Sequence, residues 1–434
     1  MEYNIVEVKV MLLEFSIKNF LSFKDKITFS MEAASGNENE ENITIKDNER
    51  ILKTTALYGA NASGKTNLIK AFTSAIMMIR MSNNRQIGEN LIQMEPFAFD
   101  EENKNNPCEF EFVFIANGNK YIYGFVADKD KVYEEYLYQY FSVKATRIFE
   151  RINCNEYKFL QSDEGKLNTI KEKNTDNKLF LATATNWNYD KTKDAYLWFA
   201  KNIDTYIGGS LLNDFAIESF SNDKNEELKK FTLRLLEEAD IFIKDFTVEI
   251  EERDVDNNLL MLFKSLNMPM PPVAQKQKDV KIRMIHEIKD GNDESKLYEL
   301  NLMNESSGTQ ILFSFAPILK DVFENGKILV IDEIERSLHP SLVEMIIKFF
   351  HNTEINKGNA QLIFNTHDTN LLSLEIFRRD QIWFAEKKPE KGATDLYPLD
   401  DFPVRKTENI QKGYLNGRYG AIPFVAMGNS LWEE

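Results

Sequence analysis

Apolar and polar residues alternate along the N-terminal third of the chain, and a period of two predicts β-strands. The aromatic-rich run at 133–141 could also stack nucleic-acid bases, but packing within a sheet is the favoured interpretation. The polar residues 35–49 predict a loop, and Asn117-Gly118-Asn119 predicts a turn between two strands. The strands expected from this pattern are residues 12–17, 26–31, 109–115, 121–126 and 133–141.

Further along, short apolar runs alternate with helical patterns. Residues 55–58 predict a strand that runs into a glycine-bounded turn, and a helix follows in which apolar residues recur at helical spacing. Continuous apolar runs at 327–331 and 361–364 are typical of parallel strands buried on both faces, and Pro340 opens a helix between them. This order predicts an α/β fold with a mixed or parallel sheet. The apolar positions of the first helix are Leu68, Ile69, Phe72, Ala75, Ile76 and Ile79.

Residues 160–275 have a different character. Polar stretches separate helical patterns there, including an apolar helix face over 228–239, and the proline-rich residues 268–272 read as an extended linker. We interpret this segment as a mainly helical insertion between two lobes of one nucleotide-binding fold, with short strands resuming at 281–286 and 297–302. The expected divisions are an N-terminal lobe at 1–159, the insertion at 160–280 and a C-terminal lobe at 281–434.

Composition narrows the classes of protein that fit. Of 434 residues, 43% are hydrophobic, which excludes a disordered or collagen-like chain. The net charge of −16 disfavours non-specific polyanion binding but leaves a local basic groove open. Cys108 and Cys154 are too few for a zinc cage or a disulfide framework. Without an apolar run of about 18 residues or a secretory signal, we expect a cytoplasmic protein that does not use a membrane.

The candidate chemistry begins with Gly59-Ala60-Asn61-Ala62-Ser63-Gly64-Lys65-Thr66, which fits the P-loop pattern between a strand and a helix. Its glycines let backbone N–H groups surround phosphate oxygens, and the helix start adds its positive end. Lys65 would reach the β- and γ-phosphates, and Thr66 would coordinate Mg²⁺. A chance glycine turn is the alternative. The flanking strand and helix favour nucleotide binding.

Two acids, Asp332 and Glu333, follow the apolar strand at 327–331. Unpaired carboxylates are costly to bury, so this ending is unusual for a buried strand. Asp332 could reach the Mg²⁺ held by Thr66, and Glu333 could face the γ-phosphate and polarise an attacking water. An exposed acidic turn is the alternative, and the presence of a P-loop favours the Walker B interpretation.

Two further elements are ambiguous by themselves. Glu305-Ser306-Ser307-Gly308-Thr309-Gln310 precedes a helix that we expect to break or kink near Pro317, and alone it predicts only a helix cap. His367 follows the strand at 361–364, and a lone histidine in such a place is more often structural than catalytic. Its position one strand beyond Asp332 favours a catalytic role.

In this order, the four elements resemble an SMC-like ABC-type ATPase. The opening Phe15-Ser16-Ile17-Lys18-Asn19-Phe20-Leu21-Ser22-Phe23 is similar to the strand signature of RecF, SMC and OLD proteins. The 305–310 motif and the ending Gly417-Arg418-Tyr419-Gly420-Ala421-Ile422-Pro423 resemble RloA-like (AAA/OLD-related) ATPases, a prokaryotic anti-phage group that includes abortive-infection and PARIS-type components. The resemblance implies an ABC-type P-loop NTPase head that hydrolyses ATP with Mg²⁺.

The resemblance also implies residue roles. ABC-type heads dimerise head to tail, so Ser306 and Gly308 would contact the γ-phosphate bound by the other subunit. Glu333 would be the catalytic carboxylate, acting with Lys65 and with His367 as the switch histidine. Residues 335–338 would form the D-loop, and Gln93 is a candidate for the Q-loop. The expected nucleotide-binding residues are Gly59, Asn61, Ala62, Ser63, Gly64, Lys65, Thr66, Asn67, Ser306 and Gly308, and the expected metal ligands are Thr66 and Asp332.

The resulting hypothesis is an ATP-driven switch of an anti-phage defence system. A homodimer, or a higher homo-oligomer, would close on ATP and control a separate effector chain, a nuclease or toxin, in response to a phage trigger. A transporter would need a membrane partner, the insertion is too short for an SMC coiled coil, and too few residues follow 386 for a fused TOPRIM nuclease. The alternatives are a RecF-like DNA-binding ATPase and a nucleotide-bound scaffold with little turnover.

Overall fold

The computed structural model describes residues 9–207, 216, 218–220, 226–254, 276–289, 294–336 and 338–422. The chain divides into two compact units, one of residues 1–208, 322–336 and 340–434, the other of residues 209–321 and 337–339. The predicted linker at 268–272, Ser337 of the expected D-loop and Pro423 lie outside the described residues.

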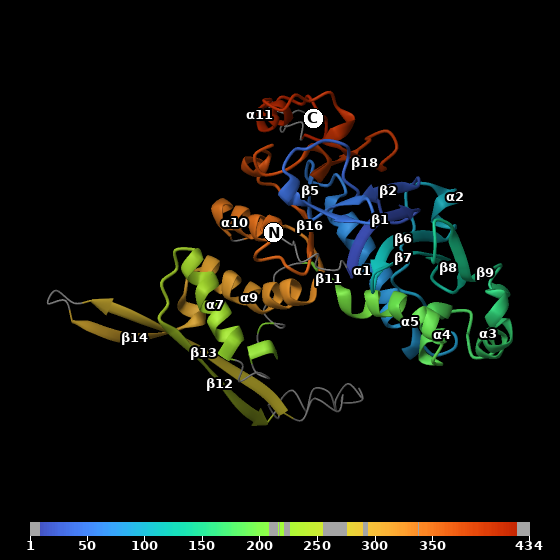
Figure 1. The fold of residues 1–434 in the computed structure, drawn as a ribbon, viewed down its shortest axis with the longest axis horizontal. Coiled ribbons are helices and arrows are strands. Elements are labelled where there is room, and N and C mark those ends of the chain that lie inside the picture. Colours follow the sequence, from blue (N-terminus) through green and yellow to red (C-terminus); the bar gives the residue numbers. More distant parts are fainter. Residues whose placement is uncertain are drawn as a thin grey trace, which may run out of the picture. The chain divides into compact units, whose positions relative to one another are not determined.

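A six-stranded sheet forms the centre of the first unit (Figure 1). In spatial order its strands are β11 (Ile203–Tyr206), β15 (Ile328–Ile331), β16 (Gln361–Asn365), β5 (Thr54–Tyr58), β17 (Ile382–Lys387) and β18 (Thr394–Pro398). The first five are parallel, and β18 pairs antiparallel with β17. Every residue of β5, β15 and β16 is buried, which confirms the prediction from their apolar runs. Because these three strands are parallel neighbours, their carboxyl ends meet at one edge.

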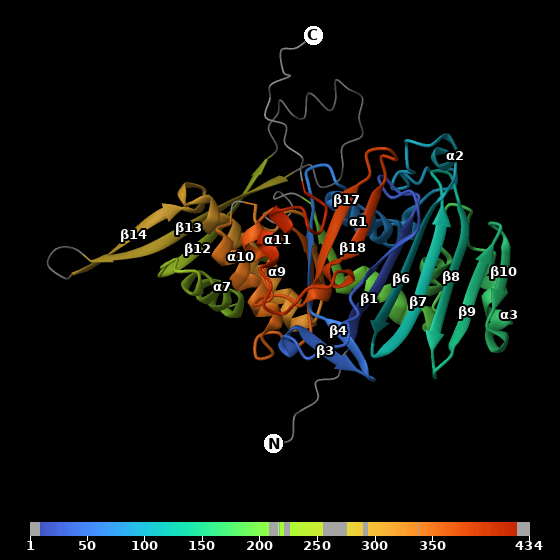
Figure 2. The same ribbon diagram turned by 90° about the horizontal axis from the view of Figure 1, so that it is seen from above.

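An antiparallel sheet of seven strands forms the second layer of this unit (Figure 2). Its strands are β10 (Glu156–Phe159), β9 (Ala145–Ile152), β8 (Val132–Tyr140), β7 (Asn119–Ala127), β6 (Cys108–Ala116), β1 (Val10–Lys18) and β2 (Ile27–Ser30). The predicted N-terminal strands are therefore confirmed. The predicted loop at 35–49 also contains the short strand β3 (Ile43–Lys46), which pairs with β4 (Glu49–Leu52).

The helix after the glycine turn, α1 (Lys65–Arg80), packs against both sheets. Phe72 is fully buried on it, with its ring centroid 4.0 Å from that of Phe15 and 6.2 Å from that of Phe112. Burying such a side chain stabilises the fold by about 1.5–3 kcal/mol. The predicted helix at Pro340 is α10 (Pro340–His351), which contacts β5 and β16. Other described helices of this unit are α2 (Glu101–Lys104), α3 (Glu164–Lys171), α4 (Phe180–Asn186), α5 (Asp190–Leu197) and α11 (Ile410–Leu415).

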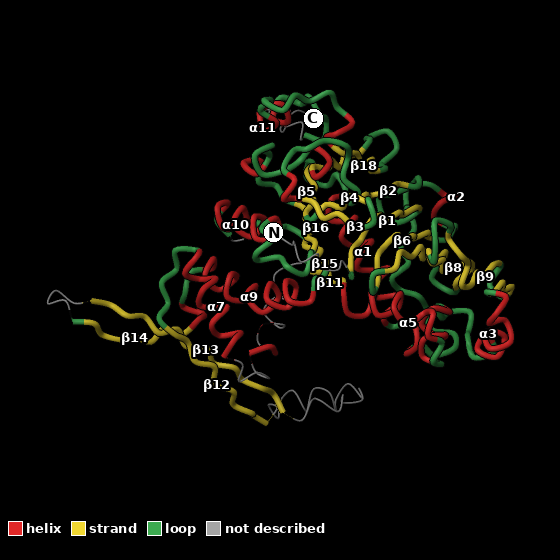
Figure 3. Tube along the Cα trace, viewed as in Figure 1, coloured by secondary structure: helices red, strands yellow, loops and turns green. Residues whose placement is uncertain are grey.

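The second unit combines helices with a three-stranded antiparallel sheet (Figure 3). The sheet contains β12 (Asp245–Asp254), β13 (Lys276–Lys289) and β14 (Ser295–Asn301). The helices include α7 (Glu226–Glu238) and α9 (Ser307–Asn325). The last turn of α9, residues 322–325, belongs to the first unit. Phe220 and Phe246 each pack on Phe313, with ring centroids 4.7 and 5.0 Å apart, and this cluster anchors α9 to the sheet.

Two expectations need correction. The described part of the segment at 160–280 is richer in helix than in strand, but it also contains β11, β12 and the start of β13, and residues up to 207 belong to the first unit rather than to a separate insertion. The physical reason is visible at 245–250, where Phe246 and Val248 alternate with polar residues at the spacing of a strand. Helix α9 also continues through Pro317, so the predicted break there is wrong, and a kink at Pro317 stays a prediction. Within the described ranges, no helix combines the length and apolar character that a bilayer crossing demands.

Candidate nucleotide-binding site

The turn between β5 and α1 is shaped by close contacts that exclude side chains. A Cβ atom on Gly59 would lie 2.4 Å from the backbone O of Ala385, and one on Gly64 would lie 2.2 Å from Thr394 Oγ1. Gly64 has a φ of 110°, a conformation that glycine adopts readily and other residues rarely do. Gly64 is the N-cap of α1 and provides no side-chain hydrogen bond. The first backbone N–H groups of the helix therefore have no side-chain cap, and they can bind an anion in the turn.

Lys65 lies inside the same turn. Its Nζ donates to the backbone O of Gly59 at 2.7 Å and to that of Ala60 at 3.2 Å. The residue is only 5% exposed, and burial lowers the pKa of Lys65 to about 8, while the nearby Glu335 carboxylate opposes that shift. A buried ammonium that can exchange these carbonyls for phosphate oxygens fits the role of a P-loop lysine.

Two hydroxyl groups brace the turn from outside. Asn67 Nδ2 donates to Ser22 Oγ at 2.8 Å, Ser22 Oγ lies 2.8 Å from Thr394 Oγ1, and Thr394 Oγ1 donates to the backbone O of Ser63 at 2.7 Å. Each hydroxyl has one proton, so Thr394 gives its proton to the carbonyl and accepts that of Ser22. The sequence predicts neither this role of the Ser22 hydroxyl nor that of Thr394, although Ser22 lies in the opening motif and Asn67 is among the expected site residues.

The expected metal ligands lie together at the carboxyl edge of the sheet. Thr66 Oγ1 donates to Asp332 Oδ1 at 3.0 Å. Asn365 Nδ2, from the end of β16, donates to the same carboxylate oxygen at 2.5 Å. Hydroxyl and carboxylate oxygens are the ligand types that Mg²⁺ prefers. Asn365 was not predicted, and its only sequence signal was its place at the end of a buried strand.

Glu333 adopts an uncommon backbone conformation for a residue with a side chain, with a φ of 53°. Strain of this kind persists only where surrounding contacts hold it, and it is frequent at functional sites. Here the Glu333 N–H donates to Asn365 Oδ1 at 2.5 Å, and the Arg336 N–H donates to the Glu333 backbone O at 3.0 Å. His367 Nε2 lies 4.0 Å from Glu333 Oε1, so the two predicted catalytic side chains are brought together.

The 305–310 motif lies in the second unit, where Ser306 is the N-cap of α9. The Thr309 N–H donates to Ser306 Oγ at 3.1 Å, and Gln310 Nε2 donates to the backbone O of Glu305 at 2.8 Å. His286 Nε2 and Glu305 Oε1 are 2.7 Å apart, which ties the motif to β13. The local geometry is thus the helix cap that the sequence predicts. The role of Ser306 and Gly308 toward a second subunit stays a prediction.

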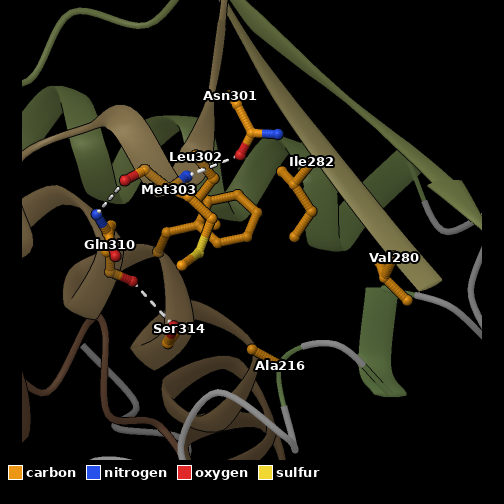
Figure 4. A pocket seen from close by; sticks show the side chains of 9 residues that line it. Ala216, Val280, Ile282, Asn301, Leu302, Met303, Gln310 and Ser314 are labelled. Carbon is orange, nitrogen blue, oxygen red and sulfur yellow. Dashed lines mark hydrogen bonds between the residues drawn. The ribbon is translucent and has the colours of Figure 1, made fainter. Parts of the chain in front are cut away.

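A hollow of about 130 Å³ lies beside this helix start in the second unit (Figure 4). Its walls are mostly apolar and include Ile282, Met303 and Phe313. At its rim, Gln310 Nε2 donates to the backbone O of Met303 at 3.2 Å, and the Met303 N–H donates to Asn301 Oδ1 at 2.9 Å. These bonds fix the short connection from β14 to α9.

The first unit therefore gathers the predicted P-loop, Asp332, Glu333 and His367 at one edge of its parallel sheet. Gln93, the Q-loop candidate, accepts a hydrogen bond from Arg85 Nη2 at 3.0 Å, and its role as the Q-loop residue stays a prediction. The residues present fit a nucleotide with Mg²⁺. Ser63 Oγ supports that fit, since it is buried and has no hydrogen-bond partner among the described residues, as expected beside a phosphate.

A comparison with protein-family models places the chain in a family. A family model described as "AAA domain, putative AbiEii toxin, Type IV TA system" matches residues 54–373, which run from β5 to beyond His367. One similar solved structure is an SMC head bound to the C-terminal winged-helix domain of ScpA, with a TM-score of 0.35 and 12% identity over 89% of this chain and 97% of that chain. Another is the Smc head domain of Pyrococcus furiosus with an extended coiled coil, bound to the C-terminal domain of ScpA, with a TM-score of 0.33 and 12% identity over 90% and 96%. No curated protein sequence matches.

Proposed function

The chain belongs to the AAA-domain family described as a putative AbiEii toxin of a type IV TA system, and we propose that it is a Mg²⁺-dependent ATPase that acts as the regulatory switch of an anti-phage defence system. One observation carries the ATPase assignment. Lys65, the Thr66–Asp332 pair and the strained Glu333 converge within one compact unit. The defence role is supported by the family description and by the resemblance of the motifs to anti-phage ATPases.

In the proposed mechanism, Lys65 exchanges the carbonyls of Gly59 and Ala60 for phosphate oxygens. Thr66 and Asp332 would hold Mg²⁺, which neutralises phosphate charge when bound. The Glu333 carboxylate, 45% exposed, orients and polarises the attacking water, and His367 beside it stabilises the charge that develops. The protein contributes mainly positioning and electrostatics, as in other phosphoryl-transfer sites.

The switch would be a dimer that closes on ATP. Ser306 and Ser307 are exposed at the start of α9, which is the arrangement that a contact with the nucleotide of a second copy needs. ATP would then bias two states, open and closed, by binding the closed one more tightly. We propose that a separate effector, a nuclease or toxin, reads the closed state.

The ATPase assignment is tested by nucleotide binding and turnover with Mg²⁺. Lys65→Ala should lose nucleotide binding, because it removes the charge that meets the phosphates. Lys70→Ala is the matched control, since Lys70 is exposed on the same helix, and it should bind like the parent. A parent protein without Mg²⁺-dependent turnover, or a Lys65→Ala variant that binds normally, would contradict the assignment.

The wider role needs separate assays. Phage plaque counts, with the chain and its neighbouring gene expressed together, should show protection that Lys65→Ala abolishes. Growth arrest by this chain alone would instead indicate that it is the toxin. ATP-dependent DNA binding that falls steeply with salt would favour the DNA clamp, which the net charge of −16 disfavours. Nucleotide-dependent association without turnover, measured by light scattering, would favour the scaffold.

A further inference from the structure

Glu335 lies two residues beyond Glu333, in the turn after β15, and its two carboxylate oxygens have different surroundings. Oε1 accepts the backbone N–H of His367 at 2.6 Å. Oε2 is buried and has no hydrogen-bond partner among the described residues. Leaving a buried carboxylate oxygen without a hydrogen-bond partner lowers stability, so a glutamate at this position needs a reason other than stability.

The bond from Glu335 joins the loops at the ends of two neighbouring strands. Asn365 already links these loops, since its Oδ1 accepts the Glu333 N–H at 2.5 Å and its backbone O accepts the Ile334 N–H at 3.3 Å. Asn365 therefore fixes the start of the turn after β15. Glu335 reaches back from that turn to the loop after β16 and fixes His367.

His367 depends on such an anchor. Its side chain is 43% exposed, so packing does not determine the direction of the ring by itself. Its Nε2 nevertheless lies 4.0 Å from Glu333 Oε1, and a backbone shift of 1 Å would change that separation substantially. Small misplacements of this size are enough to reduce turnover strongly.

We propose that Glu335 is a positioning residue that holds the backbone of His367 so that its imidazole faces Glu333. Its kinetic consequence rests on the ATPase function proposed above, but the anchoring itself does not. Glu335 acts through an accepted hydrogen bond, so the neutral glutamine, which also offers an oxygen, can replace it.

The competing role for Glu335 is a counter-charge for Lys65, whose pKa it raises more than any other carboxylate. The two roles separate cleanly by substitution. Positioning needs the oxygen and tolerates Glu335→Gln, whereas a counter-charge needs the negative charge and fails equally in Glu335→Gln and Glu335→Ala.

The first measurement uses the nucleotide-free protein. Hydrogen exchange at the His367 amide should be faster in Glu335→Ala by about tenfold or more, because its acceptor is lost, and close to the parent rate in Glu335→Gln. Glu354→Ala is the control, since Glu354 is an exposed acid of the same unit. Unchanged exchange in Glu335→Ala would overturn the proposal.

The second measurement is steady-state turnover with nucleotide affinity measured in parallel. Glu335→Ala should lower kcat about tenfold or more at nearly unchanged nucleotide Kd, and Glu335→Gln should restore kcat. A Glu335→Gln variant as impaired as Glu335→Ala, or a changed Kd with unchanged kcat, would overturn positioning in favour of the counter-charge. If the parent does not hydrolyse ATP, the proposed function fails, and the exchange result alone decides the role of Glu335.

Discussion

Replacement of Thr394 by valine tests whether the strand β18 supports the phosphate-binding turn. Valine has nearly the shape of threonine but no hydroxyl, so the hydrogen bond to the Ser63 carbonyl disappears and Ser22 loses its acceptor. Thr394 and Ser63 are each 3% exposed, so water cannot easily replace the lost partner. The change therefore isolates the brace without opening a cavity.

The expected magnitude follows from the unpaired carbonyl. Leaving one buried acceptor without its donor costs about 1–3 kcal/mol. If this cost appears wholly in nucleotide affinity, at about 1.4 kcal/mol for each factor of ten, the dissociation constant rises about 5- to 140-fold. If the turn is already formed in the free protein, part of the cost appears instead as a lower melting temperature of the free protein.

The assay is a titration with a fluorescent ATP analogue, paired with thermal unfolding of the free protein. Thr394→Ser keeps the oxygen and should bind like the parent. Thr169→Val removes an exposed hydroxyl that bonds only its own helix, and it is the control for the change of residue type. Parent-like affinity and melting in Thr394→Val would refute the reasoning that β18 braces the turn.

Two further predictions concern stability. His351 is buried with its Nε2 2.7 Å from Thr54 Oγ1, and burial lowers the pKa of His351 to about 3; between that pH and 6.5 the unfolded chain binds a proton that the folded protein does not. The free energy of unfolding should therefore fall with decreasing pH in this window, by at most about 1.4 kcal/mol per pH unit. Measured by urea unfolding, the free energy of His351→Gln should depend less steeply on pH than that of the parent. Equal pH dependence of the two proteins would contradict a neutral His351 in the folded state. Phe72→Ala should lower the free energy of unfolding by about 3–5 kcal/mol. Phe141→Ala is the control and should change it little, because Phe141 is 56% exposed. Equal losses in the two variants would contradict the packing described for Phe72.

The sequence predicts the phosphate-binding turn and the two acids because both depend on local spacing. A glycine-bounded turn between a strand and a helix specifies its own conformation, and Asp332 follows a strand whose apolar run already implies a central place. The antiparallel sheet is equally predictable, since its alternation of apolar and polar residues spans nine residues in several strands.

Contacts between distant segments are not predictable in this way. Thr394 reaches the turn only because β18 joins the sheet beside β17, and nothing near residue 394 indicates that it lies next to Gly64. Asn365 likewise acquires its role from the neighbouring β15. In the second unit, the strands predicted at 281–286 and 297–302 correspond to β13 and β14, whereas β12 was not predicted. The apolar alternation of β12 covers only a few residues before the charged run at 251–254, so the pattern is short.

In the proposed mechanism, hydrolysis of ATP depends above all on the Glu333 carboxylate. The most direct measurement is the identity of the nucleotide that remains on Glu333→Gln after incubation with Mg²⁺ and ATP, compared with the parent. If Glu333 polarises the attacking water, intact ATP should remain on the variant and ADP on the parent, with similar initial binding to both. Release of ADP from the variant at the rate of the parent would contradict it.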